Sequence, residues 1–269
     1  MKILVLGDAV GLSGRLAIQK NLSKIKFKNN INFTIINGEN AADDGKGITK
    51  EIVDEFISQG IDVITSGNHI WDKDETTKFI DEEHRLLRPA NLAEGSPGKG
   101  FGIFLSKDKK FKIGVINLMG NVFMRKTDDV FLTAKEICKK IQLKKNVDFL
   151  VVDFHGEITS EKMAIGNLFD GFATLVVGTH THVPTNDARV LKKGTGYITD
   201  AGMCGDYDSV IGMDAKNSIN KFLKKDALKH FPANGEASLS GVVVDCDISS
   251  GLAKNIESFI FGGSLKNIN

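Results

Sequence analysis

Five short apolar stretches of the chain each end at residues whose side chains bind metal ions. Runs of four to eight apolar residues rich in Val and Ile are typical of buried strands. In open α/β sheets, the residues just beyond the carboxyl ends of the strands form the ligand site. The stretches and their polar ends are Ile3–Gly7 with Asp8, Phe33–Gly38 with Glu39 and Asn40, Val63–Gly67 with Asn68 and His69, Phe149–Phe154 with His155, and Leu175–Thr179 with His180, Thr181 and His182. If these strands lie side by side, their polar ends meet at one site.

Helical patterns alternate with the apolar stretches in the first half of the chain. The expected helices are at about Ser13–Lys24, Thr49–Gln59 and Lys73–Glu82. Ser13 and Thr49 have side chains suited to N-caps, and Gly60 is placed to end the second helix. This alternation of strand and helix predicts parallel strands joined by crossover helices.

The second half of the chain mixes parallel and antiparallel signals. The expected elements are a hairpin of Phe101–Leu105 and Phe111–Leu118, helices at Phe131–Ile141, Ser160–Leu168 and Ala215–Leu223, a short strand at Gly196–Thr199, and an antiparallel pair of Ser238–Ile248 and Leu252–Phe261. The sequence contains no linker, low-complexity tract or internal repeat. A single domain over residues 1–269, with two packed sheets between helix layers, is the simplest α/β organisation.

Composition narrows the classes of protein that the chain can be. Hydrophobic residues make up 41% of the 269 residues, enough for a sizeable core, and the net charge of +1 argues against binding nucleic acid through bulk electrostatics. The cysteines (Cys138, Cys204 and Cys246) form neither a disulfide framework nor a zinc motif, so reduced thiols in the cytoplasm are expected. The apolar start is too short for a signal peptide, and no apolar stretch is long enough to span a membrane. We expect no membrane partner, and the sequence leaves the oligomeric state open, a homo-oligomer included.

The segment Gly178–His182 is the strongest indication of a metal site. Alternate residues of an extended chain point the same way, so His180 and His182 are expected to face one site. Asn68 offers a side-chain oxygen as a ligand, and the adjacent His69 is suited to donate a proton near neutral pH. Mixed oxygen and nitrogen ligands suit iron, manganese, zinc or nickel. The pattern therefore favours a metal-dependent hydrolase.

Other interpretations fit parts of this pattern. Asp8 by itself could be a turn residue, and the pair Glu39-Asn40 by itself could lie in an ordinary polar loop. The glycines after the first stretch lack the spacing of a dinucleotide-binding fingerprint, and the sequence has no G-x-S-x-G elbow of a serine hydrolase. His84 and His230 do not follow an apolar run, and we expect both to be solvated.

Taken together, the motifs identify a family resemblance. The motif residues are Asp8, Gly38-Glu39-Asn40, Gly67-Asn68-His69, His155 and Gly178-Thr179-His180-Thr181-His182, and the supporting stretches are Ile35–Ala42, Gly67–Asp72, Leu87–Asn91 and Tyr197–Met203. They resemble the calcineurin-like metallophosphoesterase superfamily and, more narrowly, the YmdB-type bacterial phosphodiesterases, over nearly the whole chain. Val10 stands where the superfamily usually has a histidine, and Glu39 stands where it usually has an aspartate. Both departures are features of the YmdB-type branch.

The resemblance implies a four-layer α/β/β/α sandwich with a two-metal site. The implied ligands are Asp8, Glu39, Asn40 and His182 for one ion, and Glu39, Asn68, His155 and His180 for the other. Glu39 would bridge the two ions, and Asn40 would compensate for the imidazole that is missing at Val10. Iron and manganese are the first candidates for the metal, and zinc is a further one.

The same resemblance implies a phosphoric diester hydrolase that acts on a small phosphodiester. The implied substrates are cyclic nucleotides, either 2′,3′- or 3′,5′-cyclic monophosphates. A hydroxide that bridges the two metals would attack phosphorus in line, and His69 would give its proton to the leaving alkoxide. Two alternatives stay open: a phosphomonoesterase or nucleotidase, and a regulatory protein that senses nucleotides and turns them over slowly.

Overall fold

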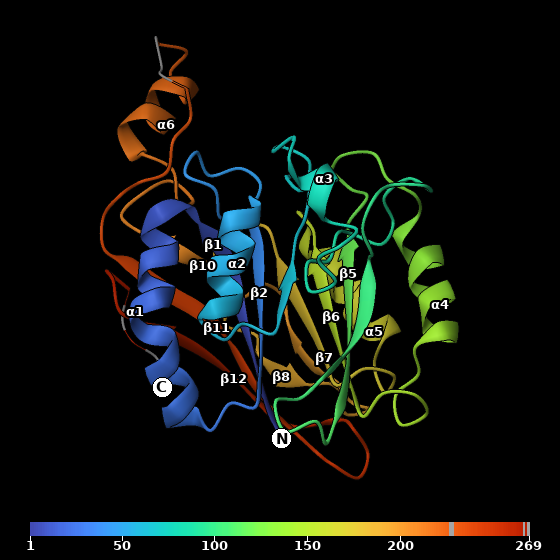
Figure 1. Cartoon of the computed structure of the whole chain (residues 1–269). Helices are drawn as coiled ribbons and strands as arrows, with labels where there is room; N and C mark the ends of the chain where they lie inside the picture. The colour runs from blue at the N-terminus through green and yellow to red at the C-terminus, as the bar shows by residue number, and fades with distance from the viewer. Residues whose placement is uncertain (226–228, 266, 268–269) are drawn as a thin grey trace.

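Within the described residues, which are 1–225, 229–265 and 267, the computed structural model forms two six-stranded sheets that lie face to face between helices (Figure 1). In spatial order, the first sheet consists of β12 (Ala253–Phe261), β11 (Ala237–Cys246), β10 (Met203–Asp206), β1 (Lys2–Val10), β2 (Phe33–Asn40) and β3 (Val63–Thr65). The second consists of β4 (Phe101–Leu105), β5 (Lys112–Met119), β6 (Phe149–His155), β7 (Leu175–Thr179), β9 (Gly196–Ile198) and β8 (Arg189–Val190). The expected α/β/β/α sandwich is confirmed.

The central strands are buried on both faces, which explains their continuous apolar runs. In β1, Leu4 and Leu6 belong to the apolar cluster beneath the helices, whereas Ile3 and Val5 belong to the cluster between the sheets. The second sheet shows the same alternation, so three apolar clusters separate the four layers. The middle cluster is shared by both sheets and fixes how the ends of their strands face each other.

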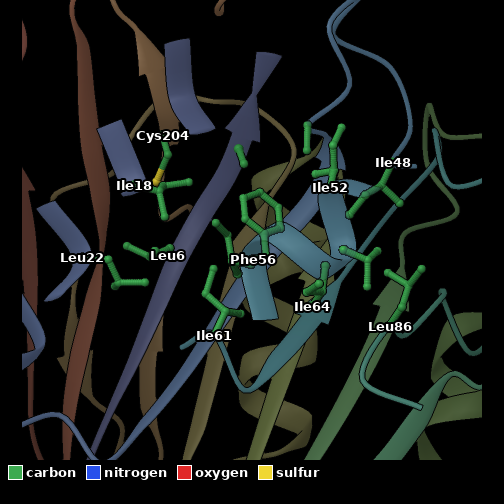
Figure 2. Packing of buried hydrophobic residues seen from close by; sticks show 14 of the residues in the cluster. Leu6, Ile18, Leu22, Ile48, Ile52, Phe56, Ile61, Ile64, Leu86 and Cys204 are labelled. Carbon is green, nitrogen blue, oxygen red and sulfur yellow. The ribbon is translucent and has the colours of Figure 1, made fainter. Parts of the chain in front are cut away.

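Two helices, α1 (Gly11–Asn29) and α2 (Lys50–Ser58), cover the outer face of the first sheet. Ile18 and Leu22 are four residues apart and therefore lie on one buried stripe of α1. Figure 2 shows this stripe packed towards Phe56 of α2 and the side chains of β1. The packing sets the position of β1 and β2, whose carboxyl ends carry predicted site residues.

The other helices of the described residues are α3 (Thr76–Phe79), α4 (Val130–Lys140), α5 (Thr159–Leu168) and α6 (Ala215–Phe222). The buried sides of α4 and α5 cover the outer face of the second sheet. In Figure 1, α6 stands apart from both sheets, beyond the ends of the strands. It therefore lies on the side of the molecule where ligands of α/β sheets bind.

Strand β1 lies inside the first sheet and not at its edge. It pairs in parallel with β2 and β10 and antiparallel with β11. In the second sheet β5, β6, β7 and β9 run parallel, and β4 forms the predicted antiparallel hairpin with β5. The expected antiparallel pair of β11 and β12 is also present. The parallel strands of both sheets point their carboxyl ends to the same side of the molecule (Figure 1).

Two expectations about helix ends are wrong. Helix α1 begins ahead of Ser13 and has no side-chain cap, and the Ser13 hydroxyl donates to the Ala233 carbonyl at 3.2 Å instead. The helix expected at Lys73–Glu82 shrinks to the four residues of α3. The Thr76 hydroxyl donates to the Ile48 carbonyl at 2.9 Å, so contacts with a neighbouring loop replace the missing helical turns.

The ends of α2 agree with the sequence. Its N-cap Thr49 accepts a hydrogen bond from the Ile52 backbone N–H at 3.3 Å. Gly60 follows the helix with a left-handed φ of 89°, which a glycine adopts without steric cost.

Two expectations concern the chain as a whole. Among residues 1–225, 229–265 and 267, no helix combines the length and the apolar character that a membrane crossing requires. The organisation of residues 1–269 as a single domain stays a prediction.

Candidate metal centre

The predicted site residues meet where the carboxyl ends of the two sheets face each other. They are Asp8 of β1, Glu39 and Asn40 of β2, Asn68 and His69 of the loop after β3, His155 of β6, and His180 and His182 of the loop after β7. A contact of 2.9 Å between Glu39 Oε1 and His155 Nε2 joins the two sheets at this point. The structure thus brings every predicted site residue into one continuous cluster.

The inner half of the centre consists of Glu39, Asn68, His155 and His180. The His155 Nε2 atom lies 2.9 Å from Glu39 Oε1 and 3.1 Å from Asn68 Oδ1. It also lies 3.0 Å from Nδ1 of His180. One ring nitrogen carries at most one proton, so it cannot satisfy all three neighbours by hydrogen bonding. Ligand atoms of Glu39, His155 and His180 all lie within 4.8 Å of one another, a grouping that could hold a metal ion.

The backbone comes closest to the inner half at Gly67. A Cβ atom at this position would lie 2.3 Å from His155 Nε2 and 2.4 Å from Glu39 Oε2. Any residue other than glycine would therefore fill the space in which the ligand atoms converge. This close approach explains the glycine of the Gly67-Asn68-His69 motif.

The outer half of the centre consists of Asn40 and His182. The His182 Nδ1 atom donates to the Ile211 carbonyl at 2.7 Å, so in the tautomer that could bind a metal ion Nε2 is an acceptor. The Asn40 amide nitrogen donates to the Gly45 carbonyl at 2.8 Å, which leaves Oδ1 towards the histidine. Two acceptors then face each other at 3.3 Å. This arrangement favours a cation between them.

The loop that carries His180 and His182 is not extended, contrary to the expectation from its sequence. Strand β7 ends at Thr179, and the two histidines adopt left-handed φ angles of 102° and 64°. These backbone angles turn His180 towards the inner half and His182 towards the outer half. Both rings therefore reach the centre, although not by the alternation of an extended strand.

A buried ion pair that the sequence analysis missed supports this loop. Lys162 Nζ lies 2.5 Å from Asp200 Oδ2, and both side chains are 1% exposed. The same ammonium group donates to the Thr179 carbonyl at 2.9 Å, and the carboxylate accepts from the Thr181 N–H at 3.1 Å. The pair thereby holds the backbone on both sides of His180. The helical pattern of α5 gave no sign that one of its lysines is buried.

Burial and neighbouring charges oppose each other at the centre. Burial raises the pKa of Asp8 to about 7, although the charges of His182 and His155 lower it. Burial disfavours the charged forms of Glu39 and His155 as well, but their mutual attraction outweighs it and moves their pKa values to about 2 and about 9. Burial and the charge of His155 lower the pKa of His180 to about 3. The inner half is therefore a charged pair beside a neutral imidazole.

Asp8 supplies further evidence that a cation fits this site. Its Oδ2 atom accepts from the His180 N–H at 3.1 Å, whereas its buried Oδ1 atom has no hydrogen-bond partner within the described ranges and lies 3.7 Å from His155 Nδ1, which is too far for a hydrogen bond. A buried carboxylate oxygen without a donor is costly unless a cation balances it. With the facing acceptors of the outer half, this set of carboxylate, amide and imidazole groups fits transition-metal ions.

A second buried carboxylate, Asp153, lies behind His155, and the sequence analysis missed it too. It accepts from Thr179 Oγ1 at 2.7 Å, from Asn37 Nδ2 at 3.1 Å and from the Thr65 hydroxyl. The Thr179 oxygen also lies 3.0 Å from His155 Nδ1, so this network orients the imidazole ring. Burial raises the pKa of Asp153 above its ordinary range. Its position as a charged residue inside an apolar strand was the available signal.

His69 lies at the rim of the centre. Its backbone N–H donates to Glu39 Oε2 at 3.0 Å, and its side chain lines the adjoining cavity. Its Nδ1 atom lies 2.7 Å from Asp72 Oδ2, and the other oxygen of that carboxylate accepts from Arg125 at 3.1 Å. Asp72 and Arg125 therefore fix the orientation of the ring, a role that the sequence analysis did not assign.

A cavity of about 600 Å³ opens over the centre. Its lining includes His180 and His182 of the centre and a wall formed by parts of the segment 210–230. His230 lines this wall and is partly buried, so it is less solvated than expected. His84 is exposed, as expected.

The comparison with known families covers almost the whole chain. The sequence profile described as YmdB-like protein matches residues 4–259. The chain belongs to the YmdB-like family. The motifs at Asp8, Glu39, Asn68, His155 and His180 all fall inside the matched residues. The family expected from those motifs is confirmed.

Relatives in the YmdB-like family share both sequence and fold with this chain. The 2′,3′-cyclic-nucleotide 2′-phosphodiesterase of Bacillus subtilis (strain 168) is 46% identical over 97% of each chain. A crystal structure of a novel phosphatase from Mycoplasma pneumoniae is 35% identical, with a TM-score of 0.89 over 97% of this chain and 93% of that chain. A hypothetical protein from Thermus thermophilus is 33% identical, with a TM-score of 0.89 over 98% of this chain and 100% of that chain.

Proposed function

We propose that this member of the YmdB-like family is a metal-dependent phosphodiesterase that hydrolyses cyclic nucleotides. The observation that carries the proposal is the convergence of Glu39, His155 and His180 beside a cavity that is also lined by His69. Hydrolysis of a phosphodiester requires positive charge near the phosphoryl oxygens and a proton for the leaving oxygen. The name of the Bacillus subtilis relative makes 2′,3′-cyclic nucleotides the first proposed substrates, and 3′,5′-cyclic nucleotides are the second.

Two groups of residues would hold the metal ions. The proposed ligands are Asp8, Glu39, Asn40 and His182 for one ion, and Glu39, Asn68, His155 and His180 for the other. When bound, the ions lower the pKa of water and offset the negative charge of the phosphoryl oxygens. The mixture of carboxylate oxygen and imidazole nitrogen leads us to propose iron or manganese, with zinc as an alternative.

His69 would give its proton to the leaving oxygen of the substrate. Asp72 contacts Nδ1, so it holds the ring in place. The bond from the His69 backbone to Glu39 keeps the donor beside the centre. Cleavage of a cyclic phosphate opens a ring without releasing a fragment, so the leaving alkoxide stays within reach of this histidine.

We also propose that the protein works in the cytoplasm on a small-molecule substrate. Cys138, Cys204 and Cys246 are free thiols, and burial raises the pKa of each. Thiols that stay protonated are poor nucleophiles and suit a reducing compartment.

Metal analysis of the purified protein, combined with hydrolysis of bis-p-nitrophenyl phosphate, tests this function. We expect about two metal ions per chain and diester hydrolysis that a chelator abolishes and Mn²⁺ restores. The monoester p-nitrophenyl phosphate is the control substrate. Faster turnover of the monoester would favour a phosphomonoesterase or nucleotidase instead.

Adenosine 2′,3′-cyclic phosphate and adenosine 3′,5′-cyclic phosphate then identify the substrate class. We expect turnover of at least one of them by the metal-loaded protein. Binding without turnover in fully metallated protein would favour the regulatory alternative. Metal-free, inactive protein that Mn²⁺ cannot rescue would contradict the enzymatic function.

A further inference from the structure

One wall of the cavity carries polar and cationic side chains that the proposed reaction does not use. Ser218 and Lys221 are three residues apart on α6, which places them on one face of the helix. His230 comes from the segment after α6, and Lys46 comes from the loop between β2 and α2. All four side chains line the same cavity as the proposed metal ligands.

The charged groups of this wall are all basic. Burial and the charges of Lys221 and Lys46 lower the pKa of His230, so the three groups lie within electrostatic range of one another. In the part of the chain that the structure describes, none of them forms an ion pair with a carboxylate. The carboxylates that line the cavity, Glu39 and Glu157, contact histidines of the metal centre instead. Basic groups without a counter-charge favour an anionic ligand.

Ser218 provides an independent indication of a ligand. Its side chain is 3% exposed, and its Oγ atom has no hydrogen-bond partner among the residues that the structure describes. A buried hydroxyl without a partner is destabilising by about 1–3 kcal/mol. Ser218 lines the cavity on the same face of α6 as Lys221, so a change of its side-chain rotamer would let an oxygen of a bound anion supply the missing partner.

The wall is fastened to the outer half of the metal centre. Asn40 donates to the Gly45 carbonyl at 2.8 Å, and Gly45 directly precedes Lys46. A Cβ atom at Gly45 would lie 3.3 Å from Met213 Sδ, so this loop packs against the segment that leads to α6. His182 binds the Ile211 carbonyl of the same segment at 2.7 Å. An anion held by the wall therefore has a fixed position relative to the proposed metal ligands.

We propose that this wall is a second phosphate subsite. Its residues are Lys46, Ser218, Lys221 and His230. It would take a phosphate that the substrate carries in addition to the phosphate that is cleaved, either at the 5′ position of a nucleotide or in the linkage before the last nucleotide of a short oligonucleotide. The inference rests on the proposed phosphodiesterase function and narrows its substrate class to nucleotides with a second phosphate.

Three substrates that share one cyclic phosphate test the subsite. They are adenosine 2′,3′-cyclic phosphate, the same compound with a 5′-phosphate, and the adenosine dinucleotide that ends in a 2′,3′-cyclic phosphate. With metal-loaded protein, we expect kcat/KM to be about tenfold higher for at least one of the substrates with a second phosphate, because two exposed lysines act together. This preference should weaken as the salt concentration rises. Preference for the 5′-phosphorylated compound would identify a 5′-phosphate as the ligand of the subsite, and preference for the dinucleotide would identify a linkage phosphate.

The double variant K46Q/K221Q should reduce the preference ratio to about one. Its matched control is K216Q, because Lys216 is an exposed lysine of the same helix that does not line the cavity. The control should keep the ratio of the wild type. A wild-type ratio near one, or a ratio that K46Q/K221Q leaves unchanged, would overturn the subsite.

A binding measurement separates the subsite from the proposed catalysis. Calorimetry compares adenosine 3′,5′-bisphosphate with adenosine 3′-monophosphate in wild type, K46Q/K221Q and K216Q. Tighter binding of the bisphosphate, lost in K46Q/K221Q and kept in K216Q, supports the subsite even if none of the cyclic substrates is cleaved. Equal binding of the two compounds contradicts the subsite and leaves the phosphodiesterase function to its own tests.

Discussion

His155 and His182 face the same centre, but the chain holds them in different ways. His155 lies at the end of β6, is fully buried and contacts Glu39 of the other sheet. Asp153 and its hydroxyl partners orient the ring from behind. His182 lies in a loop with a left-handed backbone, and its ring is held by the Ile211 carbonyl of another loop. His155 therefore depends on the docking of two sheets, whereas His182 depends on loops.

This difference separates what the fold dictates from what the loops can adjust. The ends of packed strands cannot move without disturbing the cluster between the sheets. The outer half shares its loops with Lys46 and with the segment before α6, so changes there affect metal binding and the proposed phosphate subsite together. We expect the inner half to be intolerant of substitution and the outer half to tune affinity.

Replacing each histidine by alanine tests the comparison most directly, and His155→Ala should have the largest effect. We expect diesterase activity to fall on the order of 10³-fold or more, because Glu39 loses both its partner and the adjacent ligand. His182→Ala should cost only about 10- to 100-fold and spare the metal of the inner half. Steady-state kinetics with metal analysis measures both. Equal loss of metal in the two variants would show that the halves are not distinct.

His69→Ala should have the next largest effect. We expect kcat to fall on the order of 10²–10³-fold through loss of the proton donor, with unchanged metal content. His84→Ala is the matched control, since His84 is exposed and does not line the cavity. If the His69 variant loses its metal, the residue is a ligand or a structural support and not the proton donor.

Asp72→Asn should have a smaller effect that depends on the leaving group. We expect about a tenfold loss with a cyclic nucleotide, because an amide orients the ring of His69, the proposed proton donor, less well than the carboxylate does. With bis-p-nitrophenyl phosphate the loss should be slight, since p-nitrophenolate leaves without a proton. In the His69→Ala background the same substitution should add nothing. A loss that is equal for both substrates would indicate a general structural role.

The pH dependence of metal binding tests the proposed ligands of both ions, Asp8 for one and His155 for the other. Burial raises the pKa of Asp8 to about 7. Burial alone would lower the pKa of His155, but the charges of Glu39 and Asp8 outweigh it and raise this pKa to about 9. Both groups must lose a proton to bind metal, so affinity should rise by about tenfold per pH unit for each displaced proton. The rise should extend to about pH 7 for Asp8 and about pH 9 for His155.

The stability of the metal-free protein should change in the opposite direction. Both folded pKa values lie above the ordinary values of 3.8 and 6.5. The stability that each group contributes is therefore complete below its ordinary value and is lost as the pH rises through about 7 and about 9. Calorimetry of Mn²⁺ binding in buffers with different ionisation enthalpies counts the released protons. Metal uptake without proton release would contradict the assignment of these two ligands.

The sequence predicted the strands and the residues at their ends, because strands that are buried on both faces appear as continuous apolar runs. Glu39 and His155 end strands whose residues alternate between two apolar clusters, so both the strand and its polar end are readable. The resemblance to the family then predicted that the residues at these strand ends form one centre. Strand β10 was missed, because a glycine and an aspartate make up half of its four residues and leave no apolar run.

The residues that support the centre could not be predicted in the same way. Asp153 acts through Asn37 of the other sheet, and Lys162 acts through Asp200, so each depends on contacts between segments distant in sequence. Ser218 lines the cavity only because α6 lies beyond the ends of the strands (Figure 1). Local periodicity carries no information about such contacts.

The position of β1 inside its sheet has a consequence for how the protein is made. Asp8 pairs with Met203 of β10, and the preceding residues pair with β11. At about 5–20 residues per second, a ribosome needs roughly 10 to 40 s to reach Met203 after it has made Asp8. Throughout that time one edge of β1 lacks its partner strands and is open to pairing with other chains. The nascent amino-terminal region therefore has to be shielded during translation until the last quarter of the polypeptide has emerged.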